Sequence, residues 1–130
     1  MSEPRLLYID DEKDLLELAA SFFEDENFDI TTCSDFRRAL ELVKGEHFDV
    51  IITDEKMPSG SGIEFIKMIK EENVYKGRVI LVTGNLRELT GDEEELIQDV
   101  MFKPICFQTL IEKVRTAISV QAQSDSGQNP

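Results

Sequence analysis

The chain has 130 residues, 41% of them hydrophobic, which is enough for one buried core and is typical of a globular rather than a disordered protein. Its 27 acidic and 14 basic residues give a formal net charge of −13, which argues against nucleic acid or an anionic membrane surface as a direct partner. We predict one domain at residues 1–120 and a polar, mobile tail at residues 121–130.

Other features of the chain point to a cytoplasmic location. The longest apolar runs fall far short of the roughly 20 residues that span a bilayer, and the first residues lack the basic start and apolar stretch of a signal peptide. Cys33 and Cys106 show no metal-ligand spacing, so we expect two reduced, buried thiols. His47 stands alone just ahead of a predicted strand, where we expect a surface position.

Short apolar runs, of the kind that form buried parallel strands, alternate with helical patterns along the chain. Five strands are predicted, at residues 6–9, 29–33, 50–53, 79–82 and 100–102. This alternation predicts the α/β class, a doubly wound parallel sheet with helices on both faces. Right-handed crossovers leave few possible topologies.

Four of the helices have clear apolar faces. We expect Asp11 to cap the first helix and Ser34 to cap the second, and the last helix to cover residues 107–120. Residues 57–62, rich in turn-forming types, are expected to form a loop before the third of these helices. In chain order, the predicted buried residues of the four faces are Leu15, Leu18, Ala19, Phe22, Phe23; Phe36, Ala39, Leu40, Val43; Ile63, Phe65, Ile66, Ile69; and Leu110, Ile111, Val114, Ile118.

The segment after residue 83 has the weakest pattern. Thr90 and Glu93 have the spacing of a capping box, in which the hydroxyl and the carboxylate together close a helix start. Residues 84–89 are therefore predicted to be a loop, followed by a short helix with only Leu96 and Ile97 as anchors.

Polar side chains stand where four of the predicted strands end: Asp10, Asp11, Asp54, Thr83 and Lys103. If the strands are parallel and share a sheet, these residues meet at its carboxyl edge, where open α/β sheets bind ligands. Converging carboxylates suit Mg²⁺, and a carboxylate can accept a phosphoryl group. A lysine and a hydroxyl would stabilise the charge on the transferred group. Taken singly, each residue has a structural explanation as a cap, a turn or a surface group. The set as a whole predicts phosphoryl transfer.

Four motifs, all in order, resemble those of a response-regulator receiver domain of two-component signalling. They are Ile9-Asp10-Asp11-Glu12, Asp54-Glu55-Lys56-Met57-Pro58 with Gly62 after it, Leu81-Val82-Thr83-Gly84, and Lys103-Pro104. The resemblance covers the chain from about Arg5 to Val120. It implies a flavodoxin-like (βα)5 fold with a five-stranded sheet in the order 2-1-3-4-5, and a cis peptide between Lys103 and Pro104.

The resemblance also implies a role for each site residue. Asp54 would accept a phosphoryl group from a sensor histidine kinase or a phosphotransfer protein. Mg²⁺ would be held by the carboxylates of Asp10, Asp11 and Asp54 and by the backbone carbonyl of Glu55. Thr83 would bond the phosphoryl group and Lys103 would pair with it. A chain of this kind signals through protein contacts, with a downstream target that the sequence does not name, and is not a turnover enzyme.

The chain departs from the family pattern in its switch region. Val100 occupies the position where the family usually has a tyrosine or phenylalanine that changes rotamer, and valine has few rotamers and no ring. Phe102 lies on the same side of the predicted strand and is a possible substitute, although we expect it to pack in the core or against a helix. The interval from Thr83 to Lys103 is also shorter than in many members.

Two alternatives to a phosphorylatable receiver stay open. One is a receiver-like scaffold that binds its partner without phosphate, which the missing aromatic at Val100 favours. The other is a Mg²⁺-dependent aspartyl phosphatase. Such enzymes typically place a second aspartate two residues after the nucleophile, where this chain has Lys56. No output domain is recognised in these 130 residues.

Overall fold

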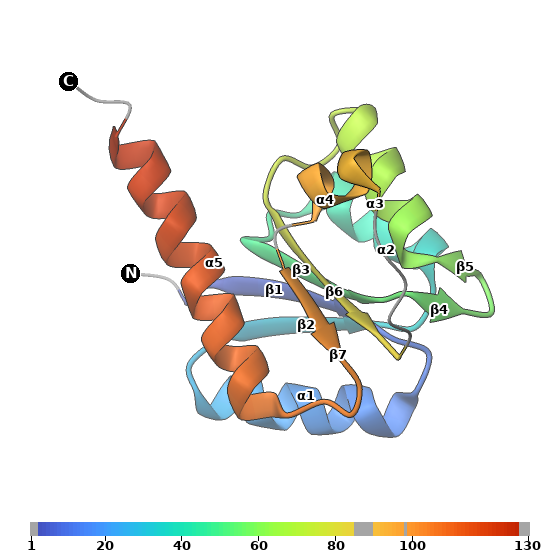
Figure 1. The fold of residues 1–130 in the computed structure, drawn as a ribbon. Coiled ribbons are helices and arrows are strands. Elements are labelled where there is room, and N and C mark those ends of the chain that lie inside the picture. The colour runs from blue at the N-terminus through green and yellow to red at the C-terminus, as the bar shows by residue number, and fades with distance from the viewer. Residues whose placement is uncertain (1–2, 85–89, 98, 128–130) are drawn as a thin grey trace.

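The computed structural model describes residues 3–84, 90–97 and 99–127. Five parallel strands form one sheet in the order β2-β1-β3-β6-β7, which confirms the expected topology. The bounds of the strands, in that order, are Asp29–Cys33, Arg5–Ile9, Val50–Asp54, Arg78–Thr83 and Asp99–Phe102. Helices cover both faces of this sheet, so the fold is doubly wound and flavodoxin-like (Figure 1).

Each face of the sheet has its own buried core. On one face, alternate residues of the strands, among them Leu6, Val50 and Ile80, pack beneath α1 (Lys13–Asp25) and α5 (Phe107–Gly127). On the other face, Leu7 and Ile51 pack beneath α2 (Phe36–Gly45), α3 (Gly62–Glu71) and the end of α4 (Gly91–Leu96). Because the central strands are covered on both sides, they are apolar at consecutive positions rather than at alternate ones.

The first helix begins one residue later than predicted and buries a different set of side chains. Its N-cap is Glu12 rather than Asp11, and Glu12 makes no side-chain capping bond. Its buried residues are Leu16, Ala19 and Phe23. Leu18 and Phe22, which we expected in the core, are 50% and 44% exposed. Helical spacing is compatible with burial of either set of residues. Packing against the sheet determines that the face containing Leu16 is the buried one.

The second and third helices largely agree with the sequence analysis. Asp35 rather than Ser34 caps α2, because its carboxylate accepts a hydrogen bond from the Arg38 amide at 2.8 Å. All four residues predicted on the apolar face of α3 are buried. The expected loop before α3 contains a small antiparallel ribbon, formed by β4 (Lys56–Met57) and β5 (Gly60–Ser61). This ribbon projects beside the carboxyl end of β3 (Figure 1).

The short fourth helix is confirmed. The Thr90 hydroxyl accepts a hydrogen bond from the Glu93 amide at 3.2 Å, and the Glu93 carboxylate accepts one from the Thr90 amide at 3.0 Å. Ile97 is buried and Leu96 is half-buried. The predicted loop lies outside the described residues except for Gly84.

The last helix is longer than predicted. It continues to Gly127, so the expected end at residue 120 is wrong, because the polar sequence after Val120 extends the helix without needing an apolar face. The division into a domain at residues 1–120 and a mobile tail stays a prediction. No helix among the described residues is long and apolar enough to cross a membrane.

The cysteines and the histidine can also be placed. Cys33 and Cys106 are both free thiols. Cys33 is buried as expected, whereas the expectation for Cys106 is wrong: it lies exposed in the turn between β7 and α5. His47 is exposed, and its ring lies 3.0 Å from Asp49.

Candidate functional site

The register of the sheet brings the predicted site residues to one edge. Ile9 of β1 pairs with Thr53 of β3, so Asp10, just past the end of β1, lies level with Asp54, the last residue of β3. Thr83 pairs with Phe102, so Lys103 lies one residue beyond this pair. The Lys103 amide donates a hydrogen bond to the Thr83 carbonyl at 2.9 Å, and this bond extends the pairing beyond β7.

Three carboxylates form a cluster at this edge. One oxygen from each of Asp10, Asp11 and Asp54 lies within 4.8 Å of the other two. Asp10 is fully buried, Asp54 is 4% exposed, and Asp11 is exposed to solvent. The cluster is therefore open on the side of Asp11 and enclosed beneath Asp10 and Asp54.

Lys103 brings a positive charge to the cluster. Its ammonium group lies 3.2 Å from Asp54 Oδ2 and donates a hydrogen bond to it. The peptide between Lys103 and Pro104 is cis, as the resemblance implied. Thr83 is buried on the neighbouring strand and has an interaction partner.

The backbone after Asp54 is held in place by the start of α3. A Cβ atom on Gly62 would overlap the Asp54 carbonyl oxygen and lie 3.2 Å from the carbonyl carbon, so only glycine fits there. The Gly62 amide donates to the Glu55 carbonyl at 2.8 Å. This bond occupies one of the two lone pairs of the carbonyl that we predicted as a Mg²⁺ ligand.

The side chain of Glu55 has a structural role that the sequence analysis missed. Its carboxylate accepts hydrogen bonds from the Ser61 hydroxyl at 2.9 Å and from the Ile63 amide at 3.0 Å. A carboxylate at a helix N-terminus satisfies amides that lack a partner within the helix. No local signal marks this role, because the bonds exist only once β4 and β5 fold back.

Burial dominates the electrostatics of the cluster. Loss of solvent raises the pKa of Asp10 to about 6, and the negative charge of Asp54 contributes to this rise. The hydrogen bond from the Glu12 amide partly opposes it. Burial also raises the pKa of Asp54, although Lys103 opposes this. For Lys103, burial lowers the pKa, but the hydrogen bond and the charge of Asp54 outweigh it, so its pKa is raised. The pocket thus disfavours its own negative charges, and Lys103 offsets them only in part.

The residues present fit a hard divalent cation. Asp10 Oδ1 accepts the Glu12 amide at 2.9 Å, whereas Oδ2 is buried and has no hydrogen-bond partner among the described residues. An orphaned, buried carboxylate oxygen is costly unless a cation or a donor satisfies it. Oxygen-only ligands that keep an open, solvated side suit Mg²⁺.

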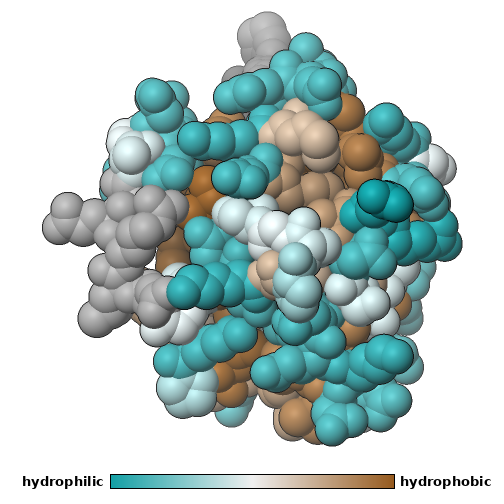
Figure 2. All heavy atoms as spheres, turned by 90° about the vertical axis from the view of Figure 1, so that its right-hand side faces the viewer, coloured by the Kyte–Doolittle hydropathy of each residue, from teal (hydrophilic) through white to brown (hydrophobic). Residues whose placement is uncertain are grey.

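The edge that carries the ribbon β4–β5 is the right-hand side of Figure 1. Figure 2 views the molecule from this side and shows a mainly hydrophilic surface with hydrophobic patches between the charged groups.

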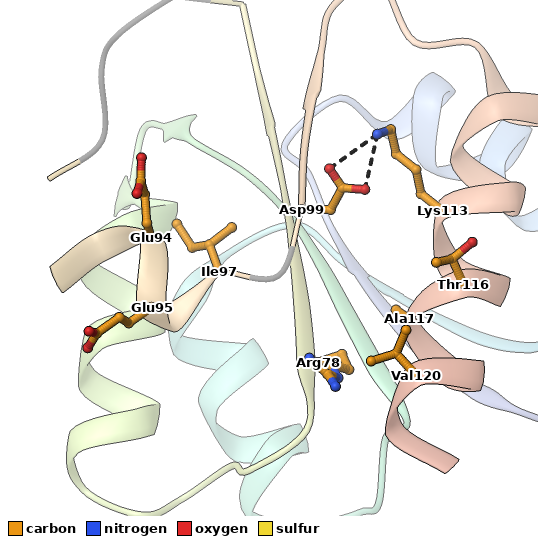
Figure 3. Close-up of a pocket in the computed structure, with 9 residues that line it drawn as sticks. All are labelled: Arg78, Glu94, Glu95, Ile97, Asp99, Lys113, Thr116, Ala117 and Val120. Carbon is orange, nitrogen blue, oxygen red and sulfur yellow. Dashed lines mark hydrogen bonds and ion pairs between the residues drawn. The ribbon is translucent and has the colours of Figure 1, made fainter. Parts of the chain in front are cut away.

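A separate groove lies between α4 and α5, beside the edge strand β7 (Figure 3). It has acidic residues on the α4 side and an ion pair on the other side, where the Lys113 ammonium donates to both Asp99 oxygens at 3.0 and 3.2 Å. None of the carboxylates of the cluster lines it.

Comparison with known proteins identifies the family. The model of the response regulator receiver domain matches residues 6–115, so the chain belongs to this family of two-component signalling domains. The response regulator SaeR of Staphylococcus epidermidis is 36% identical over 66 residues, which are 51% of this chain and 28% of that protein. The phosphate regulon regulatory protein PhoB of Escherichia coli is 25% identical over 122 residues, covering 88% of this chain and 51% of that protein. The chain thus spans between about a quarter and a half of these curated relatives.

Solved structures agree with the fold. The receiver domain of the Francisella response regulator 1452 is 26% identical, with a TM-score of 0.82, and the match covers 92% of this chain and 99% of that one. The response regulator TrrA of Thermotoga maritima, solved in complex with Mg(2+)-BeF, is 26% identical with a TM-score of 0.78, covering 88% of this chain and 98% of that one. Receiver domains are phosphoryl-accepting signalling modules that bind Mg²⁺ at an acidic pocket and are generally not turnover enzymes.

Proposed function

We propose that Asp54 accepts a phosphoryl group from a sensor histidine kinase or a phosphotransfer protein in a Mg²⁺-dependent reaction. The observation that carries this proposal is the position of its carboxylate, which is nearly buried, lies in a cluster with Asp10 and Asp11, and is bonded by Lys103 at 3.2 Å. The chain then signals by protein contacts to a target that is still to be identified. A cytoplasmic location and the absence of direct nucleic-acid contacts stay predictions from the sequence.

The transfer step is a displacement at phosphorus. A carboxylate oxygen of Asp54 forms the new P–O bond while the P–N bond to the donor's histidine breaks, and the electron pair leaves with the imidazole. Lys103 offsets negative charge on the phosphoryl oxygens, and the Thr83 hydroxyl donates to one of them. The product is an aspartyl phosphate, which the chain passes on or hydrolyses once rather than turning over.

The metal is proposed to bind the carboxylates of Asp10, Asp11 and Asp54, with the Glu55 carbonyl contributing its second lone pair. When bound, Mg²⁺ would supply positive charge that offsets these carboxylates and the incoming phosphoryl group. Phosphorylation adds about 1.5 to 2 negative charges to a site that already holds three carboxylates. Lys103 alone leaves that charge uncompensated, so the reaction requires the metal. The complex of the similar TrrA with Mg(2+)-BeF supports this.

Labelling with a small acyl-phosphate donor tests the assignment. In the presence of Mg²⁺, the intact chain is expected to gain the mass of one phosphoryl group, and Asp54→Asn is expected to gain none. Asp35→Asn is the matched control, because an asparagine still caps α2 and the charge change is the same. Labelling of Asp54→Asn to the level of the control would refute the proposal.

A second candidate, a scaffold that acts without phosphate, is favoured by Val100. This residue is half-buried, packs against the core beneath α3, and has no ring to move. Phe102, which we expected to be packed, is instead 47% exposed, so that expectation is wrong. Beryllofluoride with Mg²⁺ discriminates the two functions. NMR shift changes that reach α4 and β7 indicate a switch, whereas changes confined to the carboxylate pocket indicate a scaffold.

A further inference from the structure

Two buried side-chain oxygens, one on β1 and one on the residue after it, have no hydrogen-bond partner among the described residues: the Tyr8 hydroxyl and Asp10 Oδ2. Both residues are fully buried. One group is a donor and the other an acceptor, and each would destabilise the fold if it were left unsatisfied. A hydroxyl within the otherwise apolar run 6–9 is the one sequence signal for this feature.

Tyr8 lies two residues before Asp10 in the chain and is near enough to Asp10 and Asp54 to be affected by their charges. The Asp10 amide continues the pairing with β2 past the end of β1 by donating to the Cys33 carbonyl at 3.0 Å, and side chains alternate along an extended strand, so Tyr8 and Asp10 lie on the same face. On the adjacent strand Ile52 pairs with Tyr8, and Asp54 follows two residues later on the same face. The tyrosine ring packs edge-on against Phe23 with centroids 6.5 Å apart, in the core formed with α1 and α5.

The Tyr8 phenol is protonated at neutral pH, as tyrosines ordinarily are. A phenol that stays protonated beside carboxylates is a hydrogen-bond donor. The second tyrosine of the chain, Tyr75, differs because its hydroxyl donates to the Phe48 carbonyl at 3.0 Å.

We propose that Tyr8 is a positioning residue for the metal site, whose hydroxyl holds Asp10 through a single bridging water between it and Oδ2. A buried water needs two or more polar partners, and these two orphaned atoms supply a donor and an acceptor. This water-mediated hydrogen bond would take one lone pair of Oδ2 and leave the other for the cation, and would fix the orientation of the Asp10 carboxylate. Groups that orient a metal ligand in this way typically change metal affinity by one to two orders of magnitude.

This inference rests on the proposed Mg²⁺ site and is tested by Tyr8→Phe, which keeps the ring and removes only the hydroxyl. Tyr75→Phe is the matched control, since it makes the same change at a tyrosine bonded elsewhere. Mg²⁺ affinity is measured by calorimetric titration at pH 8, and a urea unfolding curve in EDTA shows that each variant is folded. The chain has two tyrosines and no tryptophan, so the ultraviolet difference spectrum on adding Mg²⁺ reports on tyrosine alone.

The expected result is a dissociation constant for Mg²⁺ that is about tenfold weaker in Tyr8→Phe and unchanged in Tyr75→Phe. The Mg²⁺-induced tyrosine difference signal is expected to survive in Tyr75→Phe and to vanish in Tyr8→Phe. Equal affinities of Tyr8→Phe and the unmodified chain overturn the inference, as does equal weakening in both variants. An unmodified chain that binds no Mg²⁺ contradicts the proposed function itself.

Discussion

Lys103 Nζ lies 3.2 Å from Asp54 Oδ2, although 49 residues separate the two in the chain. The bond crosses from the end of β7 to the end of β3, over the intervening strand β6. It places an ammonium group beside the proposed nucleophile and opposes the effect of burial on the pKa of Asp54.

Removing this cation should impair phosphorylation without abolishing metal binding. Lys103→Ala is expected to bind Mg²⁺ through its three carboxylates but to be labelled about 100-fold more slowly, as when one charge-stabilising donor is lost from an active site. Without Lys103 the pKa of Asp54 rises further, so the defect should be larger at acid pH. Labelling rates at saturating Mg²⁺ measure this. Lys113→Ala, which removes a lysine paired with Asp99, should be labelled normally.

Asp10→Asn should stabilise the metal-free protein. The pKa of Asp10 is raised from 3.8 to about 6, which means that folding disfavours its ionised form. The resulting loss of stability is absent below about pH 4, grows as pH rises through 6, and then stays constant at on the order of 3 kcal/mol. Asparagine lacks the charge but still accepts the bond from the Glu12 amide.

Urea unfolding in EDTA at several pH values checks this expectation. At pH 7 Asp10→Asn should be more stable than the unmodified chain, and the difference should vanish below pH 4. Adding Mg²⁺ should stabilise the unmodified chain and leave the variant unchanged. A variant that is less stable at pH 7 in EDTA would show that the carboxylate is better compensated than its buried, partnerless oxygen implies.

Gly62→Ala should destabilise the protein because the new Cβ would overlap the Asp54 carbonyl oxygen. Overpacking of this kind costs about 1–3 kcal/mol, and relief of the clash would displace Asp54 from Lys103. Gly91→Ala is the control, since nothing lies within 4 Å of its Cβ and it stands in the first turn of α4. Thermal unfolding should show a lower midpoint for the first variant and an equal or higher midpoint for the second.

Thr90→Ala should loosen α4. The six-residue helix depends on its capping box, so loss of the hydroxyl is expected to cost about 1 kcal/mol. Hydrogen exchange of the amides in residues 91–97 is the sensitive measurement, and Thr90→Ser, which keeps the hydroxyl, should exchange as the unmodified chain does. Unchanged protection in Thr90→Ala would mean that packing against α3 alone holds the helix.

The grouping of the candidate site residues was predictable from the sequence because they stand at strand ends. Apolar runs located β1, β3, β6 and β7 to within about one or two residues, and parallel pairing then requires that their ends meet. The capping box of α4 was equally predictable, because Thr90 and Glu93 lie within four residues of each other in the chain. Interactions between residues close in the chain, and patterns that repeat with the period of a helix or a strand, can be predicted from the sequence.

Other features were decided by contacts between elements distant in the chain. Leu18 and Phe22 fit the helical spacing of α1 as well as Leu16 does, and only docking on the sheet determined which stripe is buried. The clash that excludes a side chain at Gly62 exists only because α3 starts against the end of β3.

By itself, the sequence determined the order of the elements and the residues that gather at the carboxyl edge of the sheet, because strand periodicity and polar strand ends are local properties. Only the tertiary structure decided how these residues are solvated and paired: Asp10 is enclosed with a partnerless oxygen, Lys103 reaches Asp54, and the Tyr8 hydroxyl is buried without a partner among the described residues. Burial and charge pairing depend on all the elements packed around the site, so no short segment of the sequence determines them.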